Sequence, residues 1–132
     1  MTGIAGAYRY ALLGVLVAAM AHADPGEVWP LRSGDVVLDD AALARIADGG
    51  SLTYFDDGVS RFSAGGAYSY TYADNGGTAF GRFRVEGAGR ICIDFRNGFG
   101  RCDMYVRNGD RLILLTEQGD RFPVKSQTGI AP

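Results

Sequence analysis

The side chains best able to do chemistry in this chain are two cysteines, fifteen carboxylates and a single histidine. Nine residues separate Cys92 from Cys102, whereas a thiol redox site is typically a C-x-x-C pair with a low-pKa thiolate. The spacing favours a structural disulfide, and that pairing requires an oxidising compartment.

The N-terminal segment predicts export to such a compartment. A weakly positive start at Arg9 precedes an apolar run over residues 11–21, and Ala21-His22-Ala23 is typical of a signal-peptidase site. We therefore expect a signal peptide over residues 1–23, cleavage after Ala23, and a periplasmic or secreted protein. The apolar run is shorter than the roughly 20 residues that cross a bilayer, so we expect no stable membrane insertion.

Cleavage would remove His22 and leave the mature chain without an imidazole. A Ser-His or Cys-His nucleophile pair, a histidine general base and a His-liganded metal site would then all be excluded. With both thiols paired and Lys125 the only lysine, we expect no catalytic residue, no cofactor and no metal site, and hence no enzyme. The mature chain would carry a net charge of −3, which offers no basic field for nucleic acid.

Pairs of carboxylates remain a possible basis for glycoside hydrolysis. Asp94 and Asp103 are the obvious pair, but the strand register derived below places them on opposite faces of a hairpin. The acidic turns at Asp56-Asp57-Gly58 and Asp74-Asn75-Gly76 lack the ligand spacing of an EF-hand loop, and we interpret both as ordinary turns.

The elements that would position these residues are predicted by turn signals every eight to twelve residues. The signals are Asp57-Gly58, Gly65-Gly66, Asn75-Gly76-Gly77, Gly87-Ala88-Gly89, Asn97-Gly98, Asn108-Gly109 and Gln118-Gly119. Between them the segments are rich in aromatic and β-branched residues, which is typical of strands. We predict strands over 51–56, 59–64, 67–73, 78–86, 90–95, 99–107, 110–116 and 120–125.

The predicted fold is mainly β, an antiparallel meander of about eight strands forming a small barrel or curled sheet, preceded by one short helix. Asp39 or Asp40 would cap that helix, Leu43 and Ile46 would share its apolar face, and Gly49 would end it. The expected domains are the signal peptide, an N-terminal arm over 24–38 with Trp29, a single β-rich domain over 39–127 and a tail over 128–132.

The hairpin around the cysteines has a predictable register. If Gly98 adopts the left-handed conformation in a three-residue loop, Phe95 lies opposite Phe99 and Cys92 lies opposite Cys102. Gly109 and Gly119 would occupy equivalent structural turns, each starting a Gly-Asp-Arg unit that we interpret as a cross-strand charge pair. Neither face of the cysteine hairpin is cleanly apolar, so its inner face stays unassigned.

Two groups of residues are candidates for ligand binding. Tyr68, Tyr70 and Tyr72 share one face of their strand, where they either form a binding platform or fill the interior. Arg82 and Arg84 share one face of the next strand, where they are either solvated or meet an acidic partner.

The chain resembles an uncharacterised family of small periplasmic proteobacterial domains, through an Ala-Leu-Ala-Arg-Ile-Ala helix, the strand Gly76-Gly77-Thr78-Ala79-Phe80-Gly81-Arg82-Phe83-Arg84-Val85 and the segments around Cys92 and Cys102. Phe83 stands where that family has tryptophan. The resemblance implies a periplasmic β-domain and brings no catalytic residues.

The function expected from these observations is a non-enzymatic exported β-domain that binds a small ligand, an envelope component or a protein partner. One alternative is a periplasmic protease inhibitor whose arm over 24–34 enters a partner's cleft; an arm packed through Trp29 would count against it. The other alternative is a carboxylate-dependent glycan hydrolase.

Overall fold

The computed structural model describes residues 29–130, and within that range it contains nine strands and one helix. In chain order these elements are β1 (Asp35–Val37), α1 (Asp40–Ala47), β2 (Ser51–Tyr54), β3 (Val59–Phe62), β4 (Ala67–Thr71), β5 (Thr78–Gly87), β6 (Arg90–Phe95), β7 (Gly100–Asn108), β8 (Arg111–Thr116) and β9 (Arg121–Thr128). The predicted signal peptide and cleavage site lie outside the described residues.

Strands β2 to β9 form a closed antiparallel barrel. Each strand pairs with the next along the chain, and β9 pairs with β2, so this eight-stranded sheet has no free edge. The mainly β meander predicted from the turn signals is confirmed, and of the two predicted forms it is the closed barrel. Closure satisfies the edge hydrogen bonds that an open sheet would expose.

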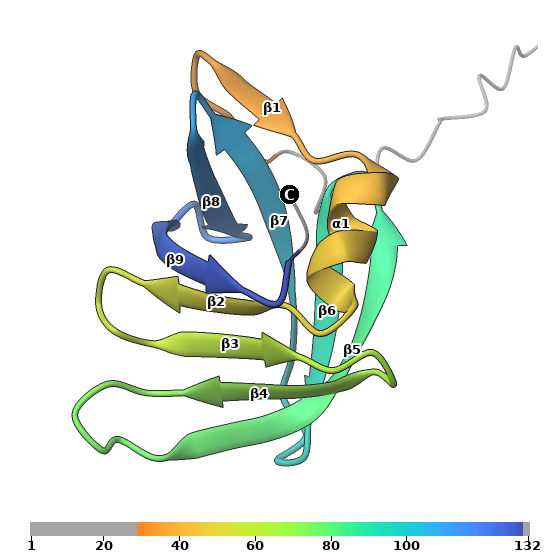
Figure 1. Cartoon of the computed structure of the whole chain (residues 1–132), viewed down its shortest axis with the longest axis vertical. Coiled ribbons are helices and arrows are strands. Elements are labelled where there is room, and N and C mark those ends of the chain that lie inside the picture. Colours follow the sequence, from red (N-terminus) through yellow and green to blue (C-terminus); the bar gives the residue numbers. More distant parts are fainter. Residues whose placement is uncertain (1–28, 131–132) are drawn as a thin grey trace, which may run out of the picture.

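Strand β5 links two parts of the barrel that run in different directions. Figure 1 shows β2, β3 and β4 crossing the direction of β6 and β7, with the long β5 curving from one set to the other. Gly81 lies in this curved strand, and a Cβ atom there would come within 2.4 Å of the Asp94 carbonyl oxygen. Only glycine therefore allows β5 and β6 to approach so closely at this point.

Helix α1 packs against the barrel beside β5, on the side away from the β2–β3 and β4–β5 turns (Figure 1). The Asp39 carboxylate caps its N-terminus by accepting a hydrogen bond from the Ala42 amide at 2.8 Å. Leu43 and Ile46 are fully buried and join the core inside the barrel. The predicted cap and apolar face are confirmed.

Two separate apolar cores explain why the inner face of the cysteine hairpin could not be assigned from the sequence. Tyr105 on β7 and Leu114 on β8 point into the barrel core. Met104 and Val106, which flank Tyr105 on β7, point outward into a second core that Trp29 covers. The strands β7 and β8 are thus buried on both faces, so alternation alone could not identify the inner one.

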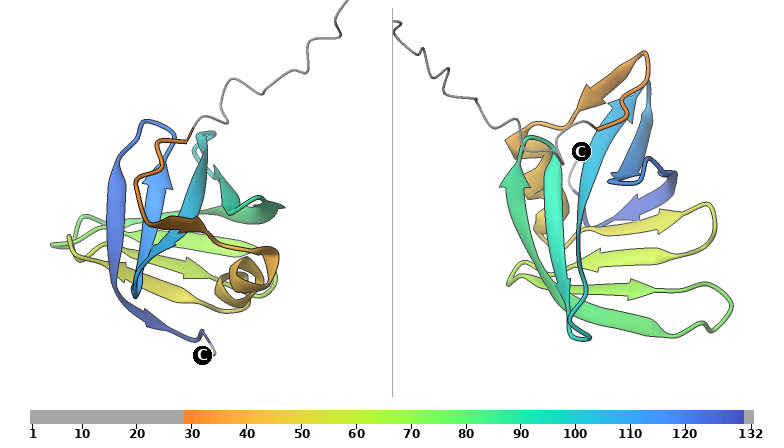
Figure 2. Two further views of the ribbon diagram at one scale, coloured as in Figure 1. Left: turned by 90° about the horizontal axis from the view of Figure 1, so that it is seen from above. Right: turned by 180° about the vertical axis from the view of Figure 1, so that it is seen from behind.

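The arm that follows Trp29 contributes a strand that was not predicted. β1 pairs with the end of β7, on the same edge of that strand as β6 but beyond it, and Figure 2 shows it there in the view from behind. Asp35 on this strand receives two hydrogen bonds of 2.8 Å from Arg121, and its side chain is 0% exposed. Arg121 therefore pairs with the arm, and the cross-strand charge pair expected in its own Gly-Asp-Arg unit is wrong.

The C-terminal segment is also more ordered than predicted. β9 continues to Thr128 where a strand to residue 125 was expected, and Ile130 packs against the core inside the barrel. The tail predicted over 128–132 thus begins within a strand.

The hairpin of β6 and β7 has the register derived from its turn. Cys92 is the Cα partner of Cys102, Gly98 has φ +91°, and the Phe95 amide donates to the Phe99 carbonyl at 2.8 Å. The two cysteines form a disulfide with a Cα–Cα distance of 4.0 Å. The predicted pairing is confirmed, and Gly109 and Gly119 also have positive φ in their turns.

Candidate functional site

A cavity of about 130 Å³ opens into the barrel among strands β2, β4, β7, β8 and β9. We name it the mouth cavity. Its wall consists of four aromatic rings, one arginine, one leucine and one threonine: Tyr54, Tyr70, Tyr72, Phe122, Arg101, Leu114 and Thr116. Most of these residues lie at the ends of strands, next to the β2–β3, β4–β5 and β8–β9 turns.

The four rings form a continuous aromatic wall. Tyr72 meets Tyr70 edge to face with 4.8 Å between ring centroids, and Tyr70 lies 6.3 Å from Tyr54. Tyr54 in turn meets Phe122 edge to face at 6.4 Å. Such contacts fix the orientation of each ring, so the wall is preorganised in the absence of a ligand.

Arg101 is the only charged side chain in this wall. Its guanidinium lies over the rings of Phe95 and Tyr70, at 5.4 and 5.8 Å from their centroids. Its Nε donates to Asp103 Oδ2 at 3.0 Å, and Nη2 donates to the Tyr68 hydroxyl at 3.2 Å. The side chain remains 39% exposed, so a cation is held in a fixed position at the cavity surface.

A chain of hydroxyl groups continues from Arg101 into the barrel. The Tyr68 hydroxyl lies 2.9 Å from Ser60 Oγ, and Ser60 Oγ lies 3.1 Å from the Tyr54 hydroxyl. Ser60 is completely buried. Burial raises the pKa of Tyr68 to about 12 and also raises the pKa of Tyr54, so these phenols are neutral donors at physiological pH.

Asp103 is the ion-pair partner of Arg101. It is 1% exposed, and burial raises the pKa of its carboxyl group while the charge and hydrogen bond of Arg101 act to lower it. Burial is the largest single influence on the pKa of Arg101 and acts to lower it, but the charge and hydrogen bond of Asp103, together with Tyr68 and Tyr105, outweigh burial and the pKa is raised. The two groups therefore form an ion pair with no net charge.

Two buried oxygen atoms near this pair have no hydrogen-bond partner among the described residues. They are Asp103 Oδ1 and the hydroxyl oxygen of Tyr105, whose side chain is completely buried. Tyr105 interacts electrostatically with Tyr54, but the two hydroxyls do not meet hydrogen-bond geometry. Buried polar atoms in native proteins are nearly always satisfied, so water or a polar ligand group is expected at these atoms.

The residues predicted to bind a ligand lie on two different faces of the sheet. Tyr68, Tyr70 and Tyr72 do share a face, and it is the inner one: Tyr68 is buried, Tyr70 is half-buried, and Tyr72 is 52% exposed at the mouth. Arg82 and Arg84 lie on the outer face of β5. The five candidates therefore do not form one site.

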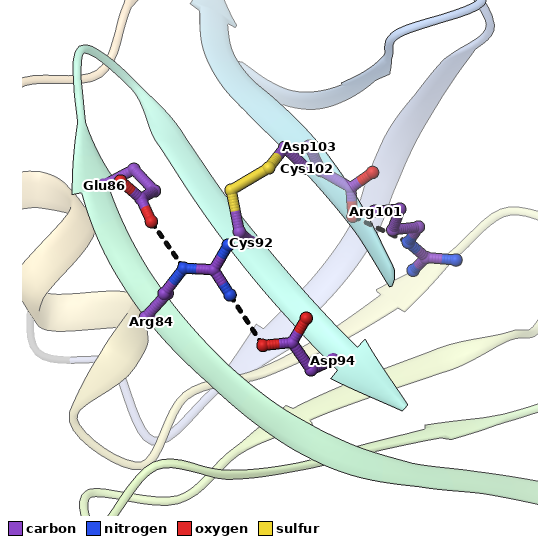
Figure 3. The surroundings of a disulfide bond; sticks show 7 residues. All are labelled: Arg84, Glu86, Cys92, Asp94, Arg101, Cys102 and Asp103. Atoms are coloured by element: carbon purple, nitrogen blue, oxygen red, sulfur yellow. Dashed lines mark hydrogen bonds and ion pairs between the residues drawn. A yellow bond between two sulfur atoms is a disulfide. The ribbon is translucent and has the colours of Figure 1, made fainter. Parts of the chain in front are cut away.

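The outer face carries the disulfide and a small group of ion pairs (Figure 3). Arg84 bridges Glu86 on its own strand and Asp94 on β6, and all three side chains are substantially exposed. Asp94 is thus outside the barrel and Asp103 inside it, as the predicted register requires. These two carboxylates cannot act on the same substrate atom.

A broader hollow of about 610 Å³ lies over the outer face of β5 and β6. It is lined by Arg82, Arg84, Asp94 and Arg96 together with apolar side chains. Arg82 donates to the Gly65 carbonyl at 3.4 Å, and Arg96 lies 5.2 Å over the Phe80 ring. This hollow contains no buried polar group, in contrast to the mouth cavity.

Sequence reasoning missed the central residue of the cavity, Arg101. A signal was present, because Arg101, Asp103 and Tyr105 alternate along β7 and must share a face. This alternation does not identify the inner face by itself, because Met104 and Val106 on the other face are apolar and equally suited to the interior.

The described residues include no group of three or more potential metal ligands. No helix in residues 29–130 is long and apolar enough to cross a membrane. Comparison with protein-family models, with curated proteins and with solved structures finds no match to this chain. The resemblance to the periplasmic family therefore stays a prediction.

Proposed function

We propose that this protein is a non-enzymatic binding domain that holds an anionic end group of its ligand in the mouth cavity, against Arg101. The observation that carries the proposal is the position of that guanidinium. It lies over two aromatic rings, is fixed by hydrogen bonds to Asp103 and Tyr68, and remains 39% exposed at the cavity wall.

The number of N–H groups on Arg101 favours an anion. A guanidinium has five N–H donors in a planar fork, and here one on Nε and one on Nη2 are used by Asp103 and Tyr68. The remaining donors on the two terminal nitrogens are suited to the paired oxygens of a carboxylate or a phosphate.

The volume of the cavity limits what enters it. Drug-sized ligands occupy pockets of about 300–1,000 Å³, whereas a cavity of about 150 Å³ holds a benzene-sized guest. At about 130 Å³ the mouth cavity suits one small molecule or the terminal group of a longer one. Tyr72 and Phe122, both partly exposed at the mouth, would contact the remainder.

The composition of the wall supports binding over catalysis. None of its seven residues is a histidine, cysteine or carboxylic acid, so it offers no general acid and base pair. Asp103 lies close by, but it is engaged by Arg101 and lies across the sheet from Asp94. These positions count against the glycan hydrolase alternative.

The site of action that we propose is the periplasm or the extracellular space, and the disulfide is compatible with it. Trp29 is packed in the outer core and is only 8% exposed. A mobile arm would have favoured a protease inhibitor, so the packing of Trp29 favours the binding domain.

Nuclear magnetic resonance titration tests the proposal. The oxidised full chain, labelled with nitrogen-15, is titrated with acetate, benzoate and inorganic phosphate, and with glucose as a neutral probe. We expect saturable shifts of the amides of Tyr72, Arg101 and Thr116 with at least one anion, and their loss in Arg101→Gln.

Arg84→Gln is the matched control, because it removes an arginine from the outer face and should leave those shifts intact. Shifts confined to the outer hollow around Arg82 and Arg96, or none with any anion, would contradict the proposal.

A further inference from the structure

The lining of the mouth cavity and the turns around it differ in the charges that they carry. At its wall, Arg101 presents unused N–H donors, and Thr116 adds an O–H group. Thr116 Oγ1 already accepts a hydrogen bond from the Asp120 amide at 3.0 Å, which leaves its proton free to donate. The wall of the cavity therefore offers N–H and O–H donors to an anionic group.

Acidic residues dominate the turns around the opening. Asp56 lies in the β2–β3 turn, Asp74 in the β4–β5 turn, and Glu117 and Asp120 in the β8–β9 turn. None of the four forms an ion pair with another described residue, in contrast to Asp57, which pairs with Lys125. Two cations lie near these turns, Arg96 in the β6–β7 turn and Arg111 over the Phe55 ring of the β2–β3 turn, so the four carboxylates still outnumber them.

Two of these carboxylates act on residues of the site. Burial raises the pKa of Tyr70, and the negative charge of Asp56 raises it further. Glu117 acts in the same direction on Asp103, after the larger effect of burial. The acidic turns are therefore close enough to influence groups in and below the cavity.

The aromatic wall lines the same cavity as the donors. The faces of tyrosine and phenylalanine rings attract cations, and alkylated ammonium groups most of all, because they lose little hydration. Arg101 already shows that this wall accepts a cation, since its guanidinium lies over Tyr70. Tyr72 and Phe122, which are 52% and 38% exposed, offer further ring surface toward the opening.

The Arg101–Asp103 pair is neutral, so Arg101 contributes directed donors and little uncompensated positive charge. A simple anion entering the cavity would meet these donors but would be repelled by the acidic turns. A simple cation would be attracted by the turns but would leave the donors of Arg101 unused. A ligand that carries both charges satisfies both ends of the site.

We propose that the ligand of the mouth cavity is a small zwitterion, or the zwitterionic end of a larger molecule, with its anionic group on Arg101 and an alkylated ammonium group against Tyr72 and Phe122. This inference rests on the proposed function and specifies the ligand class. The volume of about 130 Å³ is appropriate for one such group.

The test compares two ligands that differ in a single atom. Glycine betaine carries a carboxylate and a trimethylammonium group, and in the tert-butylacetate anion a carbon replaces the ammonium nitrogen. Both are titrated into the oxidised full chain, with choline as the cation lacking a carboxylate. We expect betaine to bind about fivefold or more tightly than the tert-butylacetate anion, and choline to bind more weakly than betaine.

Variants separate the two halves of the site. Arg101→Gln should weaken betaine and the tert-butylacetate anion by the same factor. Tyr72→Leu should reduce the preference for betaine about two- to fivefold, and Asp74→Asn combined with Glu117→Gln should reduce it further at low salt.

Two matched controls lie outside the cavity. Phe99→Leu removes a ring that is 74% exposed on the β6–β7 turn, and Asp110→Asn removes a carboxylate from the β7–β8 turn. Both should leave the preference for betaine unchanged.

Equal affinity for betaine and the tert-butylacetate anion, with both lost in Arg101→Gln, would overturn the zwitterion and leave the proposed anion site intact. Choline binding that equals betaine binding and survives Arg101→Gln would also overturn it. No binding of any probe at the mouth, benzoate and phosphate included, would overturn both proposals.

Discussion

Replacing Arg101 with methionine should destabilise the barrel in a way that depends on pH. The substitution keeps a long apolar side chain but removes the hydrogen bond of 3.0 Å from Nε to Asp103 Oδ2. Arg101 is the one described residue that donates to Oδ2, and the second oxygen, Oδ1, has no partner among the described residues. Asp103, which is 1% exposed, would be left buried and unpaired.

The size of the effect follows from the burial of the two partners. Breaking a buried ion pair by removing one partner costs about 3–5 kcal/mol. Because the Arg101 side chain is 39% exposed, water can partly replace it, and we expect the low end of this range, about 3 kcal/mol at pH 7. For a domain of this size that loss lowers Tm by about 12 °C or more.

The sign of the pH dependence follows from the raised pKa of Asp103. A carboxyl group whose pKa is higher in the folded than in the unfolded protein stabilises the fold below the unfolded pKa of about 3.9, and this stabilisation is lost as pH rises. Without Arg101 the folded pKa should rise further. The deficit of Arg101→Met relative to the wild type should therefore be largest at pH 7 and shrink toward pH 4.

Urea denaturation of the oxidised proteins at pH 7 and pH 4 measures these free energies of unfolding. Arg84→Met is the control, since its ion pairs are exposed and should contribute little to stability. The double variant Arg101→Met with Asp103→Val should recover most of the lost stability. A deficit equal to that of Arg84→Met, or one of the same size at both pH values, would refute the reasoning.

Three further predictions concern other parts of the fold. Replacing Cys92 and Cys102 with serine opens a loop whose ends are 10 residues apart and should cost about 2.7 kcal/mol in urea denaturation; a loss below half of that would contradict the entropic argument. The hydrogen bonds from Arg121 lower the pKa of Asp35, so its stabilisation is present above pH of about 4 and is lost as pH falls further. As pH falls below 4, Tm should therefore decrease more steeply in the wild type than in Arg121→Gln. Parallel curves of Tm against pH would count against a contribution from this pair. Burial raises the pKa of Tyr68 to about 12, so the stability that its neutral phenol contributes is retained up to pH of about 10 and lost toward pH 12. Ultraviolet titration should show that Tyr68 ionises together with unfolding. Complete ionisation of the tyrosines in a protein that is still folded would be inconsistent with the buried hydroxyl chain.

Local turn chemistry made the meander and the cysteine register predictable. Gly98 requires positive φ, and that requirement places Cys92 opposite Cys102 without any tertiary information. The helix was predictable for the same reason, because its cap at Asp39 and its apolar stripe are local features.

The inner face of β7 was not predictable, because it depends on a contact distant in sequence. Trp29 packs with Met104 and Val106, and Val37 of β1 packs against the same cluster, so segments distant in sequence make this face of the strand part of a second core. The strand β1 was missed for a similar reason: its hydrogen bonds are made with β7, and Asp35 is held by Arg121 from the far end of the chain. The mouth cavity could not be predicted until the inner face was known.

The presence of the Arg101–Asp103 pair inside so small a barrel is itself an argument for binding. Apolar residues in place of a buried ion pair often leave stability unchanged or improve it, so the pair is a poor way to stabilise a core. It also leaves Asp103 Oδ1 without a partner within residues 29–130, which carries a further cost. A guanidinium that is neutralised by Asp103 and keeps unused N–H donors at the cavity wall can, however, present fixed donors to a ligand. If the double variant is as stable as the wild type while its amide resonances no longer shift with any anion, the pair contributes to recognition and not to the stability of the fold.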